Sequence, residues 1–195
     1  GRFVKIGHHF GVALLATLAG CVTPAEPEPE AVAAAIQKSN AAADLLFQRL
    51  SGELTSALAN GGPAAAVVIC KNRAPVIAAE IQAASGVDIE RTALRVRRPT
   101  NAPDEWEMAT MRSFMARREA GEEWTGMFAT RIEGRQLHWM RPIPLGGMCA
   151  TCHGDPATFT QDTRLALREA YPEDQATGFK PGELRGAFSA RIELR

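Results

Sequence analysis

The stretch EWTGMFATRIEGRQLHWMRPI, residues 123–143, decides the fold class. Two strand-like segments, 123–132 and 135–143, flank Glu133-Gly134, and a glycine-containing pair between two such segments is typical of a tight β-hairpin turn. A hairpin joins neighbouring strands that run in opposite directions. The sequence therefore predicts an antiparallel sheet in the second half of the chain.

Helical patterns precede this hairpin. Asn60-Gly61-Gly62 is predicted to end a first helix over residues 31–60, and Pro63 can open a second helix over 63–84, because proline is favoured in the first turn. Pro75 should kink or split that second helix. The apolar stripe of the first helix is marked by leucines at every fourth position: Leu46, Leu50, Leu54 and Leu58.

Four further segments complete the pattern. Residues 87–96 and 183–194 read as strands, and residues 104–119 and 162–171 read as helices. Strands that cluster in this way, with helices beside them, indicate the α+β class. We expect an antiparallel sheet with flanking helices.

Composition excludes several classes of protein. The chain has 195 residues, with 22 Lys and Arg against 22 Asp and Glu, so it has no excess of basic side chains for nucleic acid. Four cysteines are too few for a disulfide scaffold of this length. These numbers indicate one globular domain, and the positions of the cysteines carry the functional information.

The first 20 residues resemble a bacterial signal peptide, with Arg2 and Lys5 before a short apolar run. The run is too short to span a bilayer, and it ends in Leu-Ala-Gly before Cys21, as lipoprotein signals do. We expect lipidation of Cys21, a Pro/Glu tether over 21–30, and a folded body over 31–195 outside the cytoplasmic membrane. A plain signal peptide is the alternative, and loss of membrane fractionation in a Cys21→Ala variant would separate the two.

The segment Cys149-Ala150-Thr151-Cys152-His153 is a C-x-x-C-H motif, the attachment sequence for c-type haem. Two thiols at this spacing can form thioethers with the two vinyl groups on one porphyrin edge, and the following histidine binds the iron. A thioredoxin-like motif does not need the adjacent histidine, and a structural zinc site needs four ligands. We expect one covalent haem, attached through Cys149 and Cys152, with His153 on the iron.

The second axial ligand is open from the residues alone. Lone methionines in strands are more often core residues than ligands, and His138 could bind the iron, donate to a propionate or be a surface histidine. Cys70 remains without a role if Cys21 is lipidated and the two motif cysteines bind haem. It is either a small buried apolar residue or a thiolate ligand to the iron. The full set of candidates is Cys70, Met127, Met140, His138 and Met148.

The body resembles a family of single-haem c-type cytochromes with a PAS-like fold, first described from cyanobacteria and also found as the extracytoplasmic sensor of histidine kinases. The residues that carry the resemblance span the body: Ile69-Cys70-Lys71, Arg98 to Asp104, Arg141-Pro142-Ile143, Cys149 to Gly154, Tyr171-Pro172, Ala176-Thr177-Gly178 and Gly182 to Ser189. The resemblance implies a PAS-like antiparallel sheet, a long N-terminal helix, and iron held by His153 and Cys70.

These features predict a lipid-anchored periplasmic cytochrome that senses redox state or a diatomic gas and reports to an unknown signalling partner. The alternative is an electron carrier between periplasmic redox proteins. We do not expect an enzyme, because two strong axial ligands leave no open iron position. Arg97, Arg98 and Arg141 are candidates for contacts with the haem propionates. Since no kinase segment follows the domain, a signal should leave by contact or by electron transfer.

Overall fold

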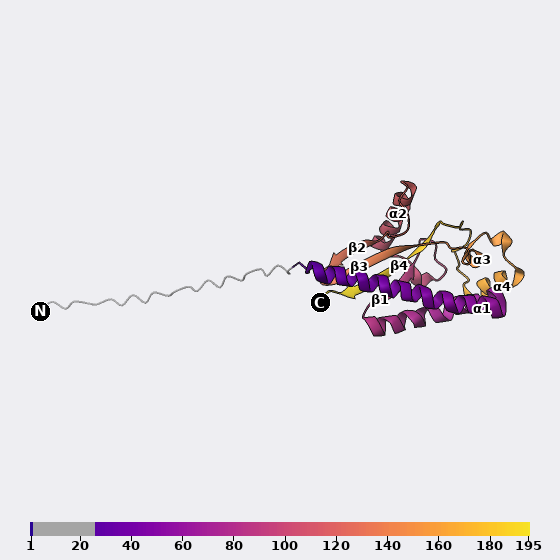
Figure 1. Ribbon diagram of the computed structural model, residues 1–195, viewed down its shortest axis with the longest axis horizontal. Helices are drawn as coiled ribbons and strands as arrows, with labels where there is room; N and C mark the ends of the chain where they lie inside the picture. The colour runs from indigo at the N-terminus through magenta and orange to yellow at the C-terminus, as the bar shows by residue number, and fades with distance from the viewer. Residues whose placement is uncertain (2–25) are drawn as a thin grey trace.

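The computed structural model describes Gly1 and residues 26–195, and within them it confirms an α+β fold with a four-stranded sheet (Figure 1). The predicted signal segment, apart from Gly1, and Cys21 lie outside these residues. Two short 3-10 turns accompany the main elements, at Pro99–Asn101 and Pro156–Thr158. The helices are α1 Pro29–Ser85, α2 Glu105–Glu119, α3 Ala150–His153 and α4 Gln161–Ala170, and the strands are β1 Asp88–Thr92, β2 Ala129–Glu133, β3 Gln136–Pro144 and β4 Leu184–Glu193.

The long helix α1 is a helical hairpin of two limbs that lie side by side (Figure 1). It reverses at Gly62, whose backbone has φ 68° and ψ −169°, a region that glycine adopts readily because it lacks a Cβ. Ion pairs join the limbs, Arg49 to Glu80 at 2.5 Å and Arg73 to Glu53 at 2.8 Å.

The predicted break between two N-terminal helices is thus confirmed. The predicted split at Pro75 is wrong, because the second limb continues through this proline. The helix also begins at Pro29, two residues before the predicted start of the folded body, since proline at the first helical position has no N–H to leave unpaired.

The sheet has strand order β1-β4-β3-β2 and is antiparallel throughout. Its two faces are covered by different helices. Leu137 and Trp139 of β3 pack with the α1 hairpin, whereas the alternate residue Met140 packs with α2, as the two-residue period of a strand requires. Trp139 is fully buried and contributes a large apolar surface to the α1 side. The functional motif lies beyond the end of β3.

Strand β1 is shorter than the predicted 87–96. Pairing with β4 ends at Thr92, whose hydroxyl donates to the carbonyl of Asn101 at 3.1 Å. The chain then leaves the sheet. In the segment that follows, Arg97 donates to the carbonyl of Cys152 in the C-x-x-C-H motif. The remaining predicted elements are confirmed with shifts of a few residues, except that the first hairpin strand begins only at Ala129. Among residues 26–195, no helix is long and apolar enough to cross a membrane.

Candidate haem site

The C-x-x-C-H segment forms a single helical turn, α3, after β3. The loop that leads into it is fixed at Leu145, whose N–H donates to the carbonyl of Glu183 at 2.8 Å and whose carbonyl accepts from Gly182 at 2.9 Å. Within the turn, the His153 N–H donates to the Cys149 carbonyl at 3.0 Å. Residues three apart on a helix share one side, so Cys149 and Cys152 are placed as the thioether motif requires.

A segment from 174 to 179 is hydrogen-bonded along the motif. The Gly178 N–H donates to the Gly154 carbonyl at 2.7 Å, and the Phe179 N–H donates to the His153 carbonyl at 3.0 Å. The Gln175 N–H donates to the Val96 carbonyl at 2.9 Å. We call residues 174–179 the bracket, because it fixes the motif to the segment after β1.

The imidazole of His153 has three polar neighbours. Its Nδ1 lies 2.6 Å from the carbonyl oxygen of Ala176, and its Nε2 lies 3.5 Å from Nη1 of Arg97. A carbonyl can only accept and a guanidinium can only donate, so both contacts require the proton on Nδ1 and the lone pair on Nε2. Arg185 Nε also donates to Nδ1, at 3.0 Å, and so competes for this nitrogen; the shorter contact with the Ala176 carbonyl assigns the proton to Nδ1. Burial, then the charges of Arg185 and Arg97, hold the pKa of His153 well below its ordinary value, so the imidazole is neutral, as a metal ligand must be.

Cys70 lies in the second limb of α1 and belongs to the same site. Burial raises the pKa of its thiol, and the nearby charges of Arg91, Arg97 and Arg185 act against that rise. Cys149 and Cys70 both act on the pKa of Cys152, so the three sulfurs are electrostatic neighbours. The fold therefore brings Cys70 to the motif from 79 positions away, which the spacing of the sequence could not show.

Three arginines converge on this group. Arg97 pairs with Asp174 at 3.0 Å, and burial followed by mutual repulsion lowers the pKa of Arg185 to about 10. Burial also lowers the pKa of Arg91. Among the described residues, Asp174 is the one carboxylate in an ion pair with any of these three arginines. Two propionates would match the excess positive charge, so the residues present fit a haem.

The predicted propionate residues differ in placement. Arg98 lies near Arg91 and Tyr171, since its charge acts on both of their pKa values, which places it beside the arginine group. Arg141 instead donates to Asp44 at 2.7 Å and to Asn40 at 3.3 Å. The guanidinium of Arg141 is therefore hydrogen-bonded to the first limb of α1, and its contact with a propionate stays a prediction. Sequence reasoning missed Arg91 and Arg185, which carry no local motif.

Three of the other candidate ligands, His138, Met127 and Met140, lie away from the motif. His138 has its Nε2 3.0 Å from Gln136 Oε1, and its ring meets the Trp106 ring edge-on. Met127 and Met140 are core residues against α2. Met148 lies beside the motif, where its sulfur accepts from the Thr55 hydroxyl at 3.5 Å. Within the described residues, no group of three or more His, Cys, Asp or Glu side chains could hold a metal ion.

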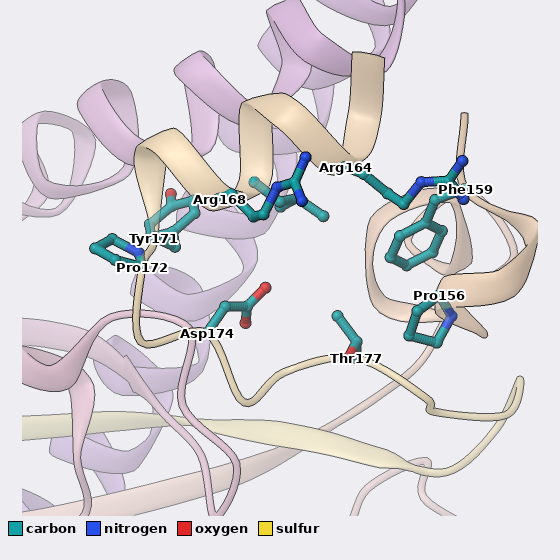
Figure 2. Close-up of a pocket in the computed structure, with 9 residues that line it drawn as sticks. Pro156, Phe159, Arg164, Arg168, Tyr171, Pro172, Asp174 and Thr177 are labelled. Carbon is teal, nitrogen blue, oxygen red and sulfur yellow. The ribbon is translucent and has the colours of Figure 1, made fainter. Parts of the chain in front are cut away.

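A pocket of about 270 Å³ lies between α4 and the bracket (Figure 2). Figure 2 shows Arg164 and Arg168 on the helix and Asp174 and Thr177 on the opposite side. Phe159, Leu167 and Tyr171, which also line it, pack in one cluster with Cys152. The pocket therefore shares a wall with the C-x-x-C-H turn.

Tyr171, the one tyrosine of the chain, offers a test of this packing. Burial raises the pKa of its hydroxyl from 10.0 to about 12. An unfolded tyrosine loses its proton at about pH 10. The stability that the buried, neutral phenol contributes is therefore complete below that pH and is lost as the pH rises through about 12. Tyrosinate absorbance should appear with a midpoint near 12, measured against a Tyr171→Phe variant as the blank. A midpoint near 10 would contradict the buried placement.

Fold and site together define a PAS-like α+β protein with a C-x-x-C-H turn. The chain belongs to the Tll0287-like family, whose model matches residues 25–193. No curated protein matches. Among solved structures, the chain is similar to the cyanobacterial heme-protein Tll0287, with 24% identity over 86% of this chain and 98% of that one and a TM-score of 0.63. This likeness supports the fold.

Proposed function

We propose that the protein is a lipid-anchored, periplasmic, single-haem c-type cytochrome that senses redox state or a diatomic gas. The observation that carries this proposal is the convergence of His153 and Cys70 with the two attachment cysteines, beside an excess of arginine charge. The family and its haem-protein member support the same cofactor.

Each residue has a distinct task in this proposal. Cys149 and Cys152 would hold the haem by thioethers, His153 would bind the iron through Nε2, and Cys70 would supply a thiolate ligand. Arg97 and Arg185, with Arg91, would balance the propionates. Bound haem supplies an iron that changes oxidation state and, when one ligand leaves, binds a diatomic gas. The protein chain sets the charge, the ligands and the exclusion of water around it.

Sensing is favoured over simple electron transfer by the position of Cys70. The second limb of α1 carries this residue, and the ion pairs Arg49–Glu80 and Arg73–Glu53 tie it to the first limb, which runs back to Pro29. Release or binding of a Cys70 ligand would therefore act directly on the element that leads toward the anchor. An electron carrier needs no ligand on such a helix, and it is the second candidate. Catalysis is not part of the proposal, since two strong ligands close the iron.

Gas binding by the reduced protein separates the two candidates. A sensor should bind CO or NO after reduction, with displacement of Cys70 and a shift of the Soret band. A Cys70→Ala variant is the positive control, because its iron already has an open position. If the reduced wild type keeps both ligands and binds neither gas while the control binds them, the protein is a carrier and the sensing proposal is wrong.

A further inference from the structure

Asp174 has no assigned role, yet it joins the haem histidine to the rest of the site. Its side chain is 10% exposed and makes two kinds of contact. Oδ1 accepts from the Ala176 N–H at 2.8 Å, and Oδ2 accepts from Arg97 Nε at 3.1 Å. Both oxygens of a nearly buried carboxylate are thus engaged with the chain.

The first contact closes a turn within the bracket. A carboxylate that accepts from the N–H two residues ahead fixes the backbone between them, as an Asx turn does. This turn directs the Ala176 carbonyl at His153 Nδ1, 2.6 Å away. Arg97 supports the same carbonyl, since its Nη2 donates to Ala176 at 3.2 Å and also to the Cys152 carbonyl.

We infer that Asp174 is the positioning residue for the haem histidine, acting through the Ala176 carbonyl; the inference rests on the proposed function. An acceptor on Nδ1–H fixes the tautomer and the ring orientation, and it makes Nε2 a stronger donor to a metal. Loss of the turn should free the Nδ1 proton to exchange with solvent. It should also weaken donation to the iron, which moves the reduction potential to more positive values.

Two substitutions distinguish a role of Asp174 in positioning the His153 ring from an effect of its negative charge. Asp174→Glu keeps the charge but displaces the carboxylate by one methylene, which breaks the turn. Asp174→Asn removes the charge but keeps an oxygen that can accept from Ala176. Glu173→Gln is the matched control, because it removes an equal charge from the exposed neighbouring residue.

The experiment measures exchange of the His153 Nδ1 proton by NMR in the reduced holoprotein, together with the reduction potential. Asp174→Glu should exchange about tenfold faster than wild type, the effect of one ordinary hydrogen bond, and should have a more positive potential. Asp174→Asn and Glu173→Gln should exchange within about threefold of wild type. Equal exchange in Asp174→Glu and wild type, or a larger effect in Asp174→Asn, would overturn the inference.

If Asp174→Glu yields no holoprotein, Asp174→Ser replaces it, since a serine hydroxyl also accepts from the N–H two residues ahead. Exchange within about threefold of wild type is then expected, and an increase of about tenfold would overturn the inference. Failure of the proposed function looks different, because wild type itself would then contain no thioether-bound haem.

Discussion

A Cys149→Ala, Cys152→Ala double variant is expected to contain no covalent haem. The two sulfurs share one side of a helical turn that is fixed at both ends by backbone hydrogen bonds, so this turn should supply both thioethers. Cys70 lies on a different element and cannot form both thioethers. Extraction with acidified acetone followed by mass spectrometry of the intact chain measures this directly.

The matched control for that experiment is Cys70→Ala, which removes one thiol of the same site and leaves both attachment cysteines. It should keep its haem through the extraction. Retention of haem by the double variant would show that attachment does not use these sulfurs.

The Cys70→Ser variant is expected to keep covalent haem and to lose thiolate ligation. A thiolate stabilises ferric iron by donating electron density, and axial ligands move haem potentials over about 0.8 V. The reduction potential of this variant should therefore rise by on the order of 0.1 V or more. Potentiometric titration and electron paramagnetic resonance of the same sample provide the two readouts.

Val68→Ala supplies the control, because Val68 is an exposed residue of the same limb and its loss leaves Cys70 in place. Its potential should match wild type. A potential and a resonance spectrum unchanged by Cys70→Ser would remove Cys70 from the iron.

Local patterns explain what could be predicted of the fold. The Glu133-Gly134 turn and the glycine break at 60–62 act within a few residues, and each appears as predicted. Pro75 does not split the limb, because packing of the limb against the sheet overrides the cost of one missing hydrogen bond. The early end of β1 depends on Asn101, which no local pattern could link to Thr92.

In the candidate site too, some residues could be predicted from local sequence patterns and others could not. The C-x-x-C-H motif is contiguous and could be recognised from its spacing alone, and haem attachment through it stays a prediction. Cys70 needed the family resemblance, because its neighbours come from a distant turn. Arg91 and Asp174 lie in no motif, and the segment that contains Arg185 gives it no role by itself. Their roles depend on long-range packing that brings β1, the bracket and β4 to one histidine.

The ferric electron paramagnetic resonance spectrum of the wild-type holoprotein tests the central claim most directly. The claim is that one covalent haem is held between the His153 imidazole and the Cys70 thiolate. It predicts a single low-spin species with the narrow spread of g values that thiolate ligation produces. A high-spin spectrum, or a low-spin spectrum of the histidine–methionine or bis-histidine kind, would contradict it.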